Sequence, residues 1–274
     1  MKKFIYKYEA MSTPCELVVY ASSKILADKS ANDVLLETKR LEKKYNYYDS
    51  TSVLSLINKR ELQELDKETK DLLNRAKKYY KATNGVFDVT IATIKSLFES
   101  ENSSASLESK IQNLKCFLGC DHFYIKKDKI IFDNLFTKID FGGFVKEYAV
   151  DRAVKVLKKN KIQNALVNYG GDIYALGKKP NGEFFKIGIK DPQNLKQYAK
   201  EVSLCNQALT TSASYERNYN VGDKNYSHII ATVKKTSDAL SISVVAPSTV
   251  EAGVYSTSLM INISLETKNK VIML

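Results

Sequence analysis

The residues best suited to chemistry lie in one segment, Ile139–Gly177. Asp140 is expected to close a strand there, the pair Gly142-Gly143 turns the chain, and an amphipathic helix begins almost at once. Such a turn exposes backbone N–H groups where the helix dipole favours negative charge, so it can hold a phosphate group. A second pair, Gly170-Gly171, is followed by the carboxylate of Asp172. Each pair taken alone is equally compatible with an ordinary turn.

The elements that must position these residues follow from hydrophobic periodicity. Strands are predicted at Cys15–Ala21, Phe123–Ile125, Ile130–Phe132, Asn164–Asn168, Phe184–Ile189 and Leu240–Val245, and helices at Ala27–Tyr45, Leu65–Thr83 and Val145–Asn160. The polar, serine-rich stretch Glu99–Lys110 is interpreted as a mobile connection. Helices and strands mix without a βαβ rhythm, which favours an α+β fold with mixed or antiparallel sheets. No repeat or shift in composition marks a boundary, so residues 1–274 are expected to form a single domain.

The composition excludes several classes of protein. Of the 274 residues, 44% are hydrophobic and 27% charged, which is typical of a globular chain. The 42 basic against 31 acidic residues give a formal charge of +11, which raises the question of an anionic partner. Nucleic acid is not favoured, because the lysines are scattered over different elements and arginine, which base readout prefers, is scarce. Neither GxGxxG nor GxxxxGK[ST] occurs, so Rossmann and P-loop phosphate binding are not supported.

The chain is expected to be cytoplasmic and to lack a membrane span. Its first residues imitate a signal peptide, but Lys7 and Glu9 interrupt the apolar run too early. The segment Ser241–Ile263 is the nearest candidate for a span, and it carries Pro247 and Glu251.

The cysteines point to a reducing compartment. Cys15, Cys116, Cys120 and Cys205 are interpreted as reduced thiols and not as a disulfide framework. A zinc site of Cys116, Cys120 and His122 is weighed against the entry to a half-buried strand. The strand is preferred, because the spacing is not that of a CxxC pair.

The segment quoted first, with its motifs DFGGFVKEYAVD and NYGGDI, resembles the ApbE family, the FAD:protein FMN transferases. The family pattern there is close to D-x-G-G-x-x-K-G-Y-A-x-D followed by N-x-G-G-D-I. Further blocks are similar to the family in the same order: Met11–Cys15, Tyr45–Asn58, Gly85–Thr90, Thr211–Arg217, His228–Ile230 and Ala246–Thr257. The resemblance covers essentially the whole chain and implies an ApbE-like, T-fold-like architecture.

The resemblance implies phosphoryl transfer. FAD would be cut at its pyrophosphate, FMN would pass to a Thr or Ser hydroxyl of a partner flavoprotein, AMP would leave, and Mg²⁺ would neutralise the charge. The residues that it implies contact FAD are Met11, Tyr48, Phe87, Asp88, Val89, Asp140, Lys146, Ile229 and Ile230. His228 is the candidate base, since an imidazole with an ordinary pKa of about 6.5 suits proton transfer at neutral pH. A structural role for this histidine is the alternative.

The departures from the family fall at the metal. The resemblance implies metal binding by the Gly143 carbonyl and by Thr257, and the family also supplies an Asp four residues before that Thr. In this chain that position is Gly253, and Glu251 lies two residues earlier. Two hypotheses follow: an active transferase, or a degenerate member that binds FAD without transferring FMN.

Overall fold

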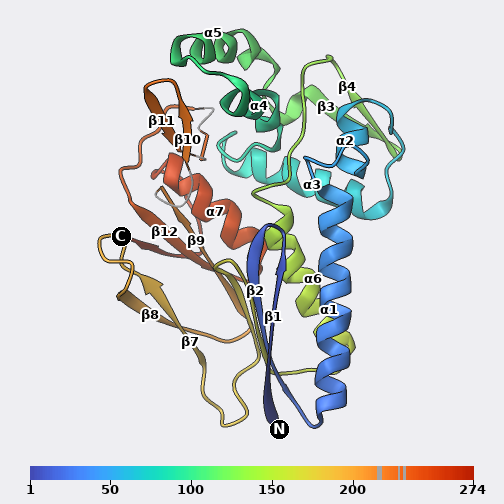
Figure 1. Ribbon diagram of the computed structural model, residues 1–274, viewed down its shortest axis with the longest axis vertical. Helices are drawn as coiled ribbons and strands as arrows, with labels where there is room; N and C mark the ends of the chain where they lie inside the picture. The colour runs from blue at the N-terminus through green and yellow to red at the C-terminus, as the bar shows by residue number, and fades with distance from the viewer. Residues whose placement is uncertain (215–217, 228, 231–232) are drawn as a thin grey trace.

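The computed structural model describes residues 1–214, 218–227, 229–230 and 233–274. It confirms the predicted α+β class with antiparallel sheets (Figure 1). Seven strands form the main sheet, and each pairs antiparallel with its neighbours. Their order across the sheet is β1 (Lys2–Ala10), β2 (Thr13–Ala21), β5 (Ala165–Tyr169), β6 (Asp172–Leu176), β9 (Gln207–Ala213), β12 (Ser241–Ala246) and β13 (Lys270–Met273).

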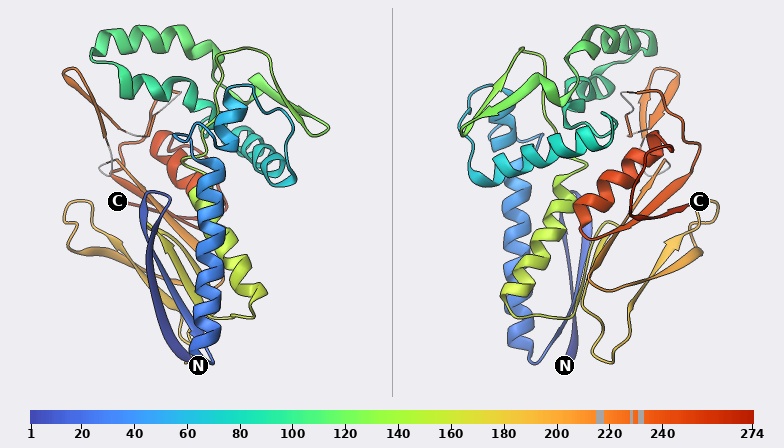
Figure 2. Two further views of the ribbon diagram at one scale, coloured as in Figure 1. Left: turned by 45° about the vertical axis from the view of Figure 1, so that its right-hand side comes forward. Right: turned by 180° about the vertical axis from the view of Figure 1, so that it is seen from behind.

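Three helices cover one face of this sheet (Figure 2). They are α1 (Lys24–Tyr45) against β2, α6 (Val145–Lys159) against β5 and β6, and α7 (Thr249–Ile261) against β9 and β12. Helix α1 is amphipathic and buries one stripe at helical spacing, whereas α7 is buried on nearly every side. The hairpin β7 (Phe185–Lys190) and β8 (Tyr198–Leu204) packs its apolar residues on the opposite face.

A second group of elements lies beyond one end of α1 (Figure 1). We call it the helical cap: α2 (Val53–Asn58), α3 (Lys67–Ala82), α4 (Ala92–Ser100), α5 (Ser104–Leu114) and the hairpin β3 (Phe123–Lys126) with β4 (Lys129–Phe132). Short 3₁₀ turns join them: η1 (Val89–Ile91), η2 (Lys115–Phe117) and η3 (Cys120–His122). The hairpin β10 (Asn218–Val221) and β11 (Lys224–Ser227) packs against α4.

The predicted strands and helices are confirmed within one to three residues at their ends, but several further elements, among them β1, β6, α2, α4 and α7, were not predicted. Strand β1 was not expected, because it is an edge strand with lysines on its exposed face. The interpretation of Glu99–Lys110 as a mobile connection is wrong: α5 begins inside it, and the Ser103 side chain caps its first turn. Asp140 does not close a strand but lies in a segment whose backbone bonds to the η1 turn. Within the described ranges, no helix is both long enough and apolar enough to cross a membrane.

An ionic network fastens α1 to α3. The carboxylate of Glu68 accepts hydrogen bonds from the Arg40 guanidinium and the Lys44 ammonium, all at 2.8 Å. Burial alone would raise the pKa of Glu68, but these two cations outweigh it and lower the pKa to about 2. The ionised Glu68 therefore stabilises the packing of the two helices.

The Glu68→Gln variant tests this stabilisation. Because the folded-state pKa lies below that of a free carboxyl, the contribution is complete above about pH 4.5 and is lost as the pH falls towards 2. At pH 7 we expect the free energy of unfolding of the variant to be about 1 kcal/mol lower than that of the wild type. At pH 3 we expect a smaller difference. Urea titration at both pH values measures this, with the exposed Glu61→Gln as control. An equal loss at both pH values would contradict the assignment.

Candidate functional site

The loop that leads into α6 places Asp140 against its own turn. One carboxylate oxygen accepts from the backbone N–H of Gly142 at 2.9 Å, and the other accepts from Lys95 Nζ at 2.6 Å. Gly143 is exposed. The N–H groups of Phe144 and Val145 donate to the Phe141 carbonyl, and no side chain among the described residues caps the start of α6. The helix dipole favours an anionic group at this end.

Lys95 also lies over two tyrosines. Its ammonium is 5.1 Å from the ring centroids of both Tyr47 and Tyr48, and its pKa is raised by the Asp140 carboxylate despite burial. The Tyr48 side chain is 67% exposed, and its hydroxyl donates to Glu99 at 2.7 Å. The ring of Tyr48 is therefore held in place and open for stacking.

The predicted loop Phe87–Val89 lies beside this cluster, since the Val89 carbonyl accepts the Asp140 N–H at 2.8 Å. Within it the Asp88 carboxylate accepts from the backbone N–H and the hydroxyl of Thr90, at 2.8 and 2.7 Å. Burial raises the pKa of Asp88. The side chain of Asp88 thus holds the turn into η1.

A second cluster of charges lies where α6, α7 and β6 meet. Lys146 Nζ forms an ion pair with Asp172 at 2.8 Å. Next along α6, Glu147 is only 6% exposed, and its Oε2 has no hydrogen-bond partner among the residues that the structure describes. Burial and the neighbouring Asp172 raise the pKa of Glu147 well above its ordinary value. Glu147 packs directly against Gly253 of α7, where an added Cβ would lie 2.6 Å from the Glu147 Cγ.

Hydroxyl groups continue this cluster along α7. Ser212 Oγ of β9 lies 2.9 Å from Ser256 Oγ and 3.0 Å from the Thr257 hydroxyl. Thr257 follows Gly253 by four residues and so lies on the same face of the helix. Glu251 lies elsewhere, because its Oε1 accepts from Asn269 at 3.0 Å.

The remaining predicted residues are placed as follows. Met11 is in the β1–β2 turn with a φ of 54°, and its N–H donates to Glu42 at 2.6 Å. This turn adjoins the β5–β6 turn before Asp172, where the Gly170 N–H donates to the Pro14 carbonyl. Ile229 packs against the main core and Ile230 against the small core of α4 and α5. His228, the candidate base, lies outside the described residues.

Two residues that position the site were missed from the sequence. Lys95 gave no signal, because a lysine on a short helix is usually a solvated residue. Asp151 is the last residue of the D-x-G-G-x-x-K-G-Y-A-x-D pattern, and that position was the available signal. Its carboxylate accepts from the backbone N–H groups of Thr249 and Val250, at 2.8 and 3.3 Å, and so ties α6 to the start of α7.

The alternative zinc site is not assembled. Cys120 is buried, Cys116 is exposed, and His122 Nδ1 lies 3.1 Å from both carboxylate oxygens of Asp133. Among the side chains that the structure describes, no three from His, Cys, Asp or Glu are grouped to hold a metal ion.

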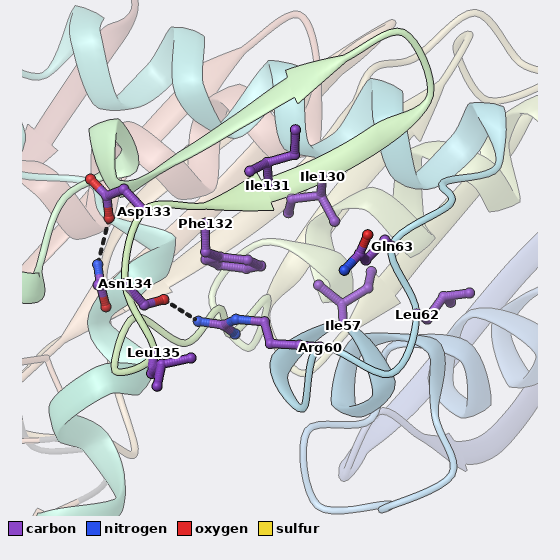
Figure 3. A pocket seen from close by; sticks show the side chains of 10 residues that line it. All are labelled: Ile57, Arg60, Leu62, Gln63, Ile130, Ile131, Phe132, Asp133, Asn134 and Leu135. Atoms are coloured by element: carbon purple, nitrogen blue, oxygen red, sulfur yellow. Dashed lines mark hydrogen bonds between the residues drawn. The ribbon is translucent and has the colours of Figure 1, made fainter.

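A cavity of about 290 Å³ lies in the helical cap, away from both clusters (Figure 3). The Arg60 guanidinium lies 3.6 Å from the centre of the Phe132 ring and donates to the carbonyls of Asn134 and Thr137. None of the predicted site residues that the structure describes lines this cavity. It is therefore not part of the candidate site.

The sequence motifs and the fold of this chain occur together in known proteins. The model of the ApbE family matches residues 11–269. The chain is 22% identical to the FAD:protein FMN transferase of Salmonella typhimurium, over 87% of this chain and 70% of that protein. It is 28% identical to that of Chlamydia pneumoniae, over 81% and 72%. The crystal structure of the ApbE protein of Thermotoga maritima superposes with a TM-score of 0.84 at 27% identity, over 95% and 87%.

The link between α6 and α7 can be tested at Asp151. In Asp151→Ala the amides of Thr249 and Val250 lose their acceptor, and we expect unfolding to require about 1–2 kcal/mol less free energy. Asp151→Asn keeps one acceptor oxygen and should lose less. Urea unfolding followed by circular dichroism measures both variants. Equal stability of the alanine variant and the wild type would contradict this role.

Proposed function

Because the chain belongs to the ApbE family, we propose that it is an FAD:protein FMN transferase. The FMN half of FAD passes to a Thr or Ser hydroxyl of a partner flavoprotein, and AMP leaves. The observation that carries this proposal is the family match over residues 11–269. No nucleic acid takes part in this reaction.

FAD binding is proposed for the surface between the helical cap and the sheet. The open ring of Tyr48 suits stacking on a flavin or adenine ring, and the uncapped start of α6 suits the pyrophosphate. Lys146, ion-paired with Asp172, lies in the first turn of that helix. Met11, Phe87–Val89 and Ile229-Ile230 are proposed to complete the FAD site, on their places in the family motifs.

A Mg²⁺ ion is proposed between α6, β6 and α7. The groups there are oxygen donors, the ligands that Mg²⁺ prefers: the Thr257 hydroxyl, the Gly143 carbonyl and the buried carboxylates of Glu147 and Asp172. The unpartnered Oε2 of Glu147 is the feature that fits a cation. When bound, Mg²⁺ supplies neutralisation of the pyrophosphate and of the charge that develops on it.

His228 is proposed as the base that takes the proton of the acceptor hydroxyl. This assignment rests on the sequence, where His228 precedes the Ile229-Ile230 pair in a block similar to the family. The rest of the chain then orients FAD and the acceptor, so the protein lowers the barrier mainly by positioning and by electrostatic stabilisation.

The transferase activity is tested by incubating the protein with FAD, MgCl₂ and an acceptor flavoprotein that carries a target threonine. We expect AMP to appear and the acceptor to gain FMN covalently, as measured by chromatography and mass spectrometry. An acceptor with Thr→Val at the target is the control and should stay unmodified. If FAD stays intact while it still raises the melting temperature of the protein, the chain binds FAD without transferring FMN.

The His228→Gln variant tests the base. Loss of a general base should lower the rate of FMN transfer about 10²–10⁴-fold. The dissociation constant for FAD should stay within a few-fold of the wild type, since the variant removes a proton acceptor and not a binding surface. Single-turnover transfer and fluorescence titration with FAD measure the two quantities. Equal rates for the variant and the wild type would remove His228 from the mechanism.

A further inference from the structure

Glu147 and Gly253 occupy one shared space between α6 and α7. A Cβ added at Gly253 would lie 2.6 Å from Glu147 Cγ and 3.1 Å from both Cδ and Oε1. Atoms of neighbouring side chains do not approach so closely, so a side chain at 253 and the present position of Glu147 exclude each other. The glycine is therefore what allows the Glu147 carboxylate to lie against α7.

We propose that Glu147 supplies from α6 the metal-binding carboxylate for which the family uses the residue at position 253 of α7. This inference rests on the proposed function and names the ligand that its metal site requires. It assigns the role to a residue that lies outside the family pattern, since K-G-Y-A has glycine where this chain has Glu147.

The two departures from the family pattern are reciprocal. Position 147 has gained a carboxylate and lost a glycine, while position 253 has lost a carboxylate and gained a glycine. Relative to the family pattern, the space between α6 and α7 therefore has the same number of acidic side chains. The acid that occupies it here comes from α6 and not from α7. A loss of metal binding alone would explain Gly253, but it would not explain a newly buried acid facing it.

The charge balance at this point favours a cation. Glu147 and Asp172 are two buried carboxylates beside a single lysine, Lys146, which is ion-paired to Asp172. Burial of a carboxylate is costly unless a positive charge or hydrogen bonds compensate it, and Glu147 Oε2 has no hydrogen-bond partner in the structure. A divalent cation bound at Oε2 would provide that compensation.

The other acidic side chains near α7 are engaged elsewhere. Asp151 accepts from the first backbone amides of α7, and Glu251 accepts from Asn269. Asp140 accepts from Lys95 and from Gly142. One or two protein carboxylates are sufficient, because Mg²⁺ usually completes its shell with water and substrate phosphates.

The test compares Mn²⁺ binding by the wild type and by Glu147→Gln, measured by calorimetry on the intact protein. Gln has nearly the same shape without the charge, so we expect Mn²⁺ to bind at least about tenfold more weakly. In metal-free buffer the variant should melt at the same or a higher temperature, because it no longer buries an uncompensated acid. Mn²⁺ should raise the melting temperature of the wild type only. Equal Mn²⁺ affinity in the two proteins would overturn the proposal.

The exchanged double variant provides a second test. Gly253→Asp alone should melt at a lower temperature, because its side chain overlaps Glu147. Combined with Glu147→Gly it should bind Mn²⁺ within a few-fold of the wild type, so that the two changes are strongly non-additive. Glu251→Gln, a carboxylate turned away from this space, is the matched control and should bind Mn²⁺ like the wild type. If the losses of Mn²⁺ affinity in the two single variants simply add in the double variant, the proposed exchange of the ligand between positions 147 and 253 is overturned.

The outcomes separate this inference from the proposed function. A wild type that binds Mn²⁺ through Glu147 but transfers no FMN would overturn the transferase and leave the ligand assignment standing. A wild type that transfers FMN while Glu147→Gln binds Mn²⁺ equally well would overturn the ligand assignment alone. A wild type that binds no Mn²⁺ would overturn the ligand assignment, and the transfer assay would still decide the transferase.

Discussion

The burial of two carboxylates beside one lysine is the constraint on which the candidate site depends. Glu147 and Asp172 lie within the layer between the sheet and its covering helices, and among the described residues Lys146 supplies the ion pair there, at Asp172. Such an arrangement is destabilising for a chain whose only task is to fold. Native proteins retain buried, incompletely compensated acids mainly at functional sites, where a ligand or cation completes the balance.

The fold must hold these groups at fixed separations, and it does so by connecting helices with charged side chains as well as apolar packing. Glu37 of α1 accepts a hydrogen bond from Arg152 of α6. The residue before it, Asp151, accepts from the first backbone amides of α7. Helix α6 is thus tied on both sides, to α1 and to α7. Because Glu147 lies one turn before Asp151, the same ties fix the distance between its carboxylate and the α7 surface.

The sequence allowed α6 and the turn before it to be predicted, but neither helix α7 nor the residues of α7 that face α6. Helix α6 has a clear apolar stripe, so its bounds and the turn before it follow from periodicity. The absence of a carboxylate at position 253 was also visible, yet its consequence was not. The residue that faces Gly253 belongs to another helix, and the contact between them is set by the packing of α6 on α7.

The nearest acid along the chain illustrates this limit. Glu251 is the acid nearest to Gly253 along the chain, only two residues earlier. Two residues along a helix turn a side chain to a nearly opposite direction, however, and Glu251 bonds to Asn269. Strand β1 and helix α5 were missed for a different reason. Both expose most of their residues, so that few buried apolar positions mark a periodic pattern.

The excess of positive charge has little direct bearing on the site. The two lysines at the site, Lys95 and Lys146, each form an ion pair with a buried carboxylate, Asp140 and Asp172. Their charge is therefore largely neutralised before any ligand binds. An anionic pyrophosphate would then depend on the uncapped amides at the start of α6 and on a divalent cation. Under the proposed function, one carboxylate and one helix end would therefore matter more to the binding of such a group than the formal charge of +11, which belongs to the chain as a whole.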